Sequence, residues 1–406
     1  GENGLQTFHF DSKRFNVYPG LSNVSNELKG AAIYGIYETA NDFILATSGG
    51  VHVYNRVTNR FIPVHEKHEV PDAAIRFRSL YREGQDKWWV CSDHGIFELT
   101  RKPDNYELTR PAELRSFPET RHLSFRNYLH VGEHELALAT THEGLIMYNR
   151  KTGSMKRYQH DPNDPASLGN NAINNIVFDR DSNIVLCHDE GMSVFYRRKK
   201  SFRNFHPFEL NSVSGLSNRY VYDVYDDGKF YWVATYGGGL NKVYKNEDSV
   251  KYFTTRQGLC NDAVYTIVPQ GDSVLWLSTN KGLSRFSIAG ESFSNFNLED
   301  GLPADEFNML SEFVNSEGEI FMATINGVVS FHPEILTQSS FQPRIYLAKV
   351  RLNGQSLTDS LTGIINRDRV IHVKYNEDLF LEFTPLTYSG TEQISIRYRM
   401  NETSDW

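Results

Sequence analysis

Residues 232–240 read WVATYGGGL: an apolar strand that ends in a small residue and a threonine, a short polar turn, a glycine, and the start of a second strand. The same arrangement occurs six more times, at residues 44–51, 88–96, 138–145, 185–192, 276–283 and 322–328. The last glycines of the seven copies are 43 to 49 residues apart. Such spacing indicates one structural unit per repeat, and a period of this length is typical of β-propellers rather than of shorter solenoid repeats.

Each repeat contains four short strands separated by turn residues. In the fifth repeat these strands are expected at residues 220–225, 230–234, 240–244 and 250–253, because polar and apolar residues alternate there. Four antiparallel strands per repeat form a propeller blade. We therefore predict an all-β fold whose main part is a seven-bladed β-propeller, with aromatic residues such as Tyr222, Tyr225, Trp232 and Trp276 packed between the blades.

The ring of blades must close, because an open set would expose a strand edge at each end. Segments 4–10 and 14–18 resemble the last strands of a repeat, whereas the final repeat, near 306–332, supplies the first strands but no clear outermost one. We predict that the N-terminal segment completes the seventh blade, so that the propeller occupies residues 1–335.

The composition limits the classes of function. A formal net charge of −8 and a pI near 6.0 argue against nucleic acid as a partner, because such binding depends on clustered Lys and Arg. No stretch of the sequence approaches the run of about 18 apolar residues that a membrane helix needs, and we expect the parent protein to continue beyond Trp406. The three cysteines include no C-x-x-C pair, and Cys91 and Cys187 occupy the small-residue position of the repeat, where burial is expected.

The repeats resemble the two-component regulator propeller repeat, in which a strand with Trp and Ala-Thr is followed by Gly-Leu and later by Gly-Leu-x-x-Asn. Residues 232–240 followed by 258–261 (GLCN), and residues 276–283 followed by 301–303 (GLP), match best. The tail adds a second resemblance. Residues 375–388 (YNEDLFLEFTPLTY), continued by 396–400 (IRYRM), are similar to the three-tyrosine domain that follows these propellers, so residues 336–406 are expected to be a linker and part of an immunoglobulin-like β-sandwich.

The resemblance implies a function for the whole parent protein. In this family, of Bacteroidetes type, the segment is the periplasmic sensor region of a membrane-anchored hybrid two-component regulator, which also carries a histidine kinase and controls transcription by phosphorelay. It implies that the segment senses an oligosaccharide, controls polysaccharide-utilisation genes, forms a homodimer through the sensor and the membrane-proximal domain, and is itself no enzyme. No cofactor, metal or nucleic acid is expected for this segment.

The repeat also indicates which side chains share one face. Loops that join the second strand to the third, and loops that join one blade to the next, converge around the central channel of a propeller. The candidate ligand-binding residues in these loops are Arg76, Arg78, Asp93, His94, Arg126, His142, Glu143, His188, Asp189, Arg219, Tyr236, Asn280, Lys281 and Asn326. Turns select Asn, Asp and Ser for backbone reasons alone, so the four arginines are the most informative members, since guanidinium groups suit sulfated or carboxylated sugars.

Two alternative functions remain open from the sequence. His94, His142 and His188 lie in corresponding turns beside acidic residues, which is compatible with a propeller enzyme such as a lyase or a metal-dependent hydrolase. The third possibility is a protein-binding propeller scaffold, which an exposed apolar face would favour over a polar cup with aromatic and arginine walls.

Overall fold

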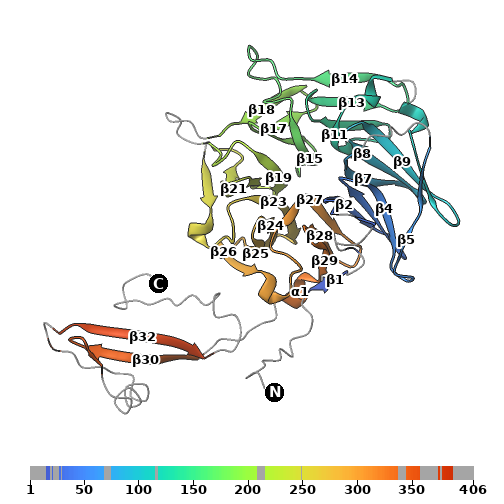
Figure 1. The fold of residues 1–406 in the computed structure, drawn as a ribbon. Coiled ribbons are helices and arrows are strands. Elements are labelled where there is room, and N and C mark those ends of the chain that lie inside the picture. Colours follow the sequence, from blue (N-terminus) through green and yellow to red (C-terminus); the bar gives the residue numbers. More distant parts are fainter. Residues whose placement is uncertain are drawn as a thin grey trace. The chain divides into compact units, whose positions relative to one another are not determined.

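The computed structural model describes residues 15–18, 21, 27–28, 30–67, 75–114, 118–207, 215–247, 249–336, 344–356, 374 and 377–386. The chain divides into two compact units, one of residues 13–336 and one of residues 1–12 with 337–406. In the larger unit seven antiparallel sheets surround a central channel (Figure 1). The predicted all-β, seven-bladed propeller is confirmed.

Six blades run from the innermost strand outward in chain order. They are β2 (Ile33–Glu38), β3 (Asp42–Thr47), β4 (Gly50–Asn55) and β5 (Arg60–Ile62); β7 (Phe77–Gly84), β8 (Lys87–Ser92), β9 (Gly95–Arg101) and β10 (Tyr106–Thr109); β11 (Phe125–His130), β12 (Glu135–Thr140), β13 (Leu145–Asn149) and β14 (Met155–Tyr158); β15 (Ile173–Phe178), β16 (Ile184–His188), β17 (Gly191–Tyr196) and β18 (Ser201–Phe205); β19 (Val221–Asp226), β20 (Phe230–Thr235), β21 (Gly239–Tyr244) and β22 (Val250–Phe253); and β23 (Val264–Gln270), β24 (Val274–Thr279), β25 (Gly282–Ser287) and β26 (Ser292–Phe296). A short strand, β6 (Val64–Glu66), adds to the second blade by pairing in parallel with β10.

The seventh blade combines the two ends of the propeller sequence. It contains β27 (Phe307–Val314), β28 (Ile320–Thr324), β29 (Gly327–Phe331) and, as its outermost strand, β1 (Asn16–Val17), which pairs antiparallel with β29. Phe15 packs edge-on against Phe331 and Phe296, with ring centroids 5.5 and 5.9 Å apart. The N-terminal segment thus completes this blade as the sequence predicts, although segment 4–10 lies outside the described residues.

Packing between neighbouring blades accounts for the apolar residues of the repeat. Trp232 of β20 is fully buried and lies 5.3 Å from Phe286 of the next blade, measured between ring centroids. Trp276 of β24 likewise packs against Phe331, at 4.9 Å. Each such aromatic side chain removes a large apolar surface from water, so aromatic packing between blades stabilises the ring.

The threonine and the glycine of the repeat have separate structural tasks. Thr235 Oγ1 donates a hydrogen bond to the carbonyl of Gly239 at 2.8 Å, which fixes the turn between β20 and β21. Gly191, at the same position in another blade, has a φ of +116°, and a Cβ there would lie 2.0 Å from the carbonyl oxygen of Phe205. Only glycine fits where the third strand passes the end of the fourth.

Short helical turns complete the larger unit. They are η2 (Ala112–Leu114), η3 (Pro118–Arg121), η4 (Thr255–Gln257), η5 (Leu298–Asp300) and α1 (Pro333–Leu336). Among the described residues, no helix has the length and hydropathy needed to span a membrane.

The smaller unit contains a three-stranded antiparallel sheet of β30 (Arg344–Leu352), β31 (Gln355–Ser356) and β32 (Leu379–Leu386), with β30 in the centre. Tyr375, Tyr388 and residues 396–400, which carry much of the resemblance in the tail, lie outside the described residues. The division of the chain into domains at residues 335 and 336 stays a prediction.

Candidate functional site

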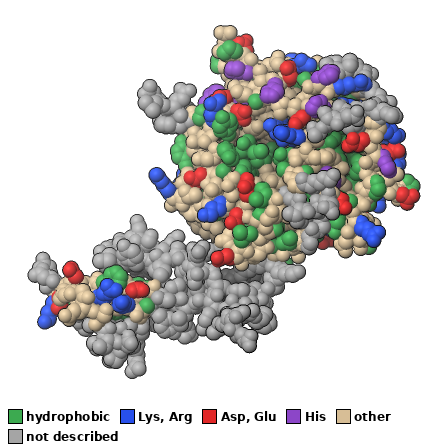
Figure 2. Space-filling view, viewed as in Figure 1, with side chains coloured by type: hydrophobic (Ala, Val, Ile, Leu, Met, Phe, Trp, Pro, Cys, Tyr) green, Lys and Arg blue, Asp and Glu red, His purple; other side chains and the backbone are tan. Residues whose placement is uncertain are grey.

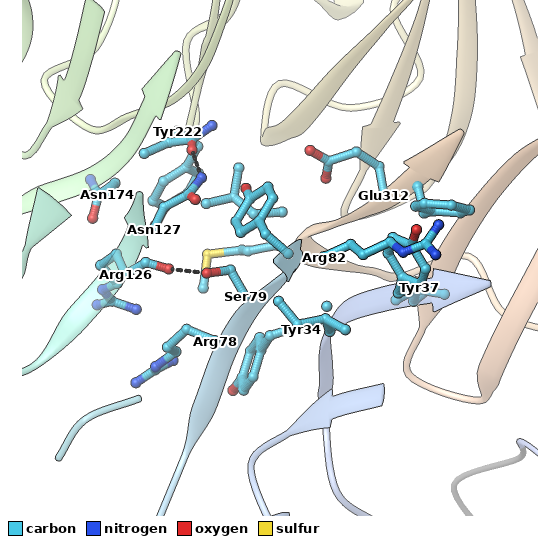
Figure 3. A pocket seen from close by; sticks show the side chains of 18 of the residues that line it. Tyr34, Tyr37, Arg78, Ser79, Arg82, Arg126, Asn127, Asn174, Tyr222 and Glu312 are labelled. Atoms are coloured by element: carbon cyan, nitrogen blue, oxygen red, sulfur yellow. Dashed lines mark hydrogen bonds between the residues drawn. The ribbon is translucent and has the colours of Figure 1, made fainter. Parts of the chain in front are cut away.

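The mouth of the central channel is a cavity of about 470 Å³ (Figure 3). Innermost strands of several blades line it, and a second depression of about 340 Å³ lies beside it. Four polar residues line both: Arg78, Arg126, Asn174 and Asp189. These residues therefore form the centre of the candidate site.

Arg78 is held in place by an ion pair. Its Nε and Nη2 atoms donate to the two carboxylate oxygens of Asp93 at 3.1 and 3.2 Å, and Ser124 Oγ donates to the same carboxylate at 3.2 Å. The guanidinium carbon lies 5.0 Å from the ring centroid of Tyr34, in a cation–π contact. Only 12% of the Arg78 side chain is exposed, so this fork is rigid and already paired.

Arg126, unlike Arg78, has a guanidinium nitrogen without a partner. Its Nε is buried without a hydrogen-bond partner, and Figure 3 shows its guanidinium beside that of Arg78. Burial, and then the nearby charge of Arg78, lower the pKa of Arg126, while Asp93 and Asp189 act in the other direction. The Asp189 carboxylate accepts a hydrogen bond from Asn174 Nδ2 at 2.9 Å. Arg126 thus carries a partly desolvated charge that the surrounding side chains compensate incompletely.

Tyrosines form the other wall of the cavity. Tyr220 and Tyr222 line it, and Tyr222 contacts Tyr236 with ring centroids 5.8 Å apart. Tyr220 is 39% exposed, whereas Tyr236, 44% exposed, lies outside the lining and stacks on Tyr265. Burial and the charge of Asp189 raise the pKa of Tyr222 to about 12, which keeps its hydroxyl neutral at physiological pH. Tyr222 was predicted to pack between the blades; it does pack, half-buried, against a hydrophobic core cluster, and it also lines the cavity.

A polar ring forms the waist of the channel. In six innermost strands a β-bulge shifts the register at the same place, and in β27 the irregularity is longer, from Phe307 to Glu312. The polar residues that follow these shifts are Ser79, Asn127, Asn175, Asp223, Thr266 and Glu312, and Gly35 takes the corresponding position in β2. Asn127 Nδ2 donates to Asn175 Oδ1 at 2.7 Å, Asn175 Nδ2 donates to Asp223 Oδ1 at 3.0 Å, and Thr266 Oγ1 donates to Glu312 at 2.9 Å.

Of the two acids of this ring, Asp223 is buried and Glu312 is half-buried. Burial and the charge of Glu312 raise the pKa of Asp223 well above its usual range, and burial raises that of Glu312. Glu312 lines both the cavity at the mouth and a second cavity of about 470 Å³, which Asp223 also lines. The two cavities thus share Asn127, Asn175 and Glu312 of this ring as lining residues.

The structure brings together five of the fourteen residues predicted from the sequence. Arg78, Asp93, Arg126, His142 and Asp189 line the cavity or the adjoining depression. Arg219 lies close by, because its Nε donates to the Asp189 carbonyl at 3.0 Å and its guanidinium pairs with Glu190. Tyr236 lies outside both linings, but its ring contacts that of Tyr222, which lines the cavity.

The remaining predicted residues lie elsewhere. Arg76, His94 and Lys281 are exposed outside these linings. Glu143 pairs with Arg157 at 3.5 Å, Asn280 Nδ2 donates to Tyr265 Oη at 2.9 Å, and Asn326 Nδ2 donates to the carbonyl of Pro303 at 3.0 Å.

His188 was placed wrongly by sequence reasoning. It occupies the threonine position of the repeat rather than the turn, and it is fully buried with Nε2 2.8 Å from Ser193 Oγ. Burial lowers the pKa of His188 to about 3. A neutral, hydrogen-bonded core histidine is its role here, and among the described residues no three His, Cys, Asp or Glu side chains gather as a metal site.

Sequence reasoning also missed residues of the inner strands. Tyr34, Ser79, Glu312 and Phe313 line the cavity, although none of them lies in a loop. The signal is a pair of polar residues directly after an apolar one at the start of an innermost strand, as in residues 77–79 (FRS) and 125–127 (FRN). Such pairs interrupt strands that are otherwise buried, and the bulge turns them toward the channel.

Comparison with known proteins places this geometry in a wider context. The chain is 23% identical, over 375 residues, to "Histidine kinase P4" of Formosa agariphila, and the match covers 88% of this chain but 27% of the kinase. The chain thus spans about a quarter of its curated relative. No family model matches.

Solved structures show the same fold. The extracellular domain of a hybrid two-component system from B. thetaiotaomicron matches with a TM-score of 0.64 and 17% identity, over 86% of this chain and 46% of that one. A second extracellular domain from the same organism, described as part of a one-component system, matches with a TM-score of 0.58 and 16% identity, over 84% of this chain and 41% of that one. This chain resembles extracellular propellers of bacterial sensors. The resemblance predicted from the repeats is confirmed.

Proposed function

We propose that this segment is the extracytoplasmic, periplasmic sensing region of a membrane-anchored hybrid two-component sensor histidine kinase and response regulator. The observation that carries the proposal is the match of most of this chain to about a quarter of a histidine kinase. The similarity to extracellular domains of two-component systems supports the same assignment.

In this proposal an oligosaccharide binds in the cavity at the channel mouth. The wall offers what a saccharide requires: exposed tyrosine rings for C–H faces, Asn174 and Asn127 amides for hydroxyls, and guanidinium groups. A volume of about 470 Å³ falls in the range of small-molecule sites. Figure 2 shows a mixture of charged, histidine and apolar side chains over the propeller rather than one continuous apolar face. On the face in this view, such a mixture favours a sugar over a protein as the ligand.

Ligand binding would change the geometry of a homodimer and thereby the phosphorelay that controls polysaccharide-utilisation genes. A ligand can act in this way only if it binds the two signalling states with unequal affinity. The dimer, the genes and the direction of signalling belong to the parent protein and are part of the proposal.

Titration calorimetry of the propeller chain against a panel of neutral and acidic oligosaccharides tests the proposal. We expect saturable binding of at least one member, and loss of that binding when Tyr222 is replaced by Ala. The absence of binding across the panel by a folded protein would contradict the proposal. Chemical conversion of a panel member would instead favour the alternative of a propeller enzyme.

A further inference from the structure

We propose that Arg126, beside Arg78, forms a subsite for the carboxylate or sulfate group of an acidic oligosaccharide. The inference rests on the proposed function and deepens it, because it names the chemical class of the ligand.

The first argument is an uncompensated charge. Arg126 Nε is buried and donates no hydrogen bond in the part of the chain that the structure describes. Removing a charged donor from water costs free energy unless a partner replaces the water. Arg126 bears this cost while it lines both the cavity and the depression beside it, so an anion bound there would lie against its side chain.

The second argument is that the nearby carboxylates already have donors. Asp93 accepts from both nitrogens of the Arg78 fork and from Ser124. Asp189 accepts from Asn174. Because these acids are held by other groups, Arg126 is available to an external anion, and its planar fork matches the two oxygens of a carboxylate or sulfate.

The third argument concerns the size and chemistry of the surroundings. The cavity is far larger than an inorganic anion, at about 470 Å³, and Tyr34 and Tyr222 line it together with Arg126. Figure 3 shows these rings and both guanidinium groups around one space. An anionic group attached to a sugar ring satisfies both the charge and the aromatic surface.

Simple anions test the subsite without any assumption about the sugar. We expect sulfate or acetate, compared with chloride at equal ionic strength, to raise the thermal unfolding temperature of the wild-type chain saturably. Arg126→Gln should abolish this rise, and Arg126→Lys should keep part of it. Arg256→Gln is the matched control, because Arg256 is exposed and lies outside the cavity. An equal rise in wild type and Arg126→Gln would overturn the inference.

Oligosaccharides identify the source of the anion. A galacturonic acid trimer carries carboxylates, a sulfated galactose oligomer carries sulfates, and a neutral galactose oligomer carries neither. We expect one of the acidic probes to bind, and Arg126→Gln to weaken it roughly 10-fold or more, since hydrogen bonds to charged groups contribute about 1.5–3 kcal/mol. Tighter binding of the neutral oligomer would refute the inference while the proposed function stands. An anion effect without binding of any oligosaccharide would contradict the proposed function instead.

The stability of the ligand-free protein separates a binding role from a structural one. Because Arg126 Nε has no partner, Arg126→Gln should leave the unfolding temperature in chloride unchanged or raised. A marked decrease would show that Arg126 supports the fold, and would count against the subsite.

Discussion

The two acids of the channel waist, Asp223 and Glu312, are expected to respond in opposite ways to the same chemical change. Asp223→Asn and Glu312→Gln each replace one carboxyl oxygen by an amide nitrogen and keep the shape of the side chain. Asp223 accepts from Asn175 Nδ2 at 3.0 Å and from the backbone N–H of Val224 at 2.9 Å through Oδ1, and from the backbone N–H of Ile267 at 2.8 Å through Oδ2. Both of its oxygens are therefore needed as acceptors.

An asparagine at this position has only one acceptor oxygen. If that oxygen keeps the contacts of Oδ1, the amide NH₂ faces the N–H of Ile267, which is then buried without an acceptor. Leaving a buried donor unpaired costs about 1–3 kcal/mol, so Asp223→Asn should lower the free energy of unfolding by roughly that amount.

Glu312→Gln has no such penalty. Glu312 accepts from Thr266 Oγ1 at 2.9 Å, and the amide oxygen of Gln can accept the same bond. Because the substitution also removes a carboxyl that is costly to ionise in this site, we expect stability at pH 7 to be unchanged or higher.

The pH dependence follows from the raised pKa of Glu312. As the pH rises above about 4.5, the carboxyl ionises first in the unfolded chain. Stability from this group is therefore complete below that pH and falls as the pH approaches the folded-state pKa. In Glu312→Gln this loss should be smaller than in the wild type.

Urea unfolding followed by tryptophan fluorescence, at pH 5 and pH 7, measures the free energy of unfolding of the wild type, Asp223→Asn and Glu312→Gln. The two variants control for each other, since each removes one acid of the same ring. The reasoning would be refuted if Asp223→Asn unfolded at the same urea concentration as the wild type. It would also be refuted if Glu312→Gln lost more free energy of unfolding than Asp223→Asn.

Three further predictions concern the fold. Gly191→Ala should destabilise the propeller by about 1–3 kcal/mol from backbone strain, with a further loss from the clash with Phe205. Gly132→Ala is the control: no atom lies within 4 Å of the added Cβ, so it should be nearly neutral in the same urea assay. Phe15→Ala should lower the free energy of unfolding by about 3–5 kcal/mol, because this buried ring anchors the closing strand; an unchanged midpoint would mean that closure does not depend on it. Cys91 is buried and its pKa is raised to about 12, so it should resist alkylation at pH 8 until urea unfolds the chain, and rapid labelling of the native protein would contradict its burial.

The sequence alone determined the architecture, because a propeller repeats its local chemistry once per blade. Each repeat contains a small residue before the threonine (Thr235), a glycine (Gly239) and apolar strands around them, at a regular spacing. Each of these residue types is required by the local structure of its own blade. Closure by the N-terminal strand could be predicted too, since the last repeat lacks an outermost strand and an open edge is unfavourable. Of the candidate site, Arg78 and Arg126 were found in this way, although they were expected in loops and lie at the start of the innermost strands β7 and β11.

Only the tertiary structure decided which polar residues face one another. His188 and Asp189 are neighbours in the sequence, yet one is buried in the core and the other lines the cavity, because β16 ends at His188 and Asp189 belongs to the turn that follows. The polar waist, with Asp223 and Glu312, depends on a shift of register in each innermost strand and on contacts between blades more than 40 residues apart in the chain. Such contacts leave no local pattern, and that is the physical reason why the ring of blades could be predicted from the sequence while the chemistry at its centre could not.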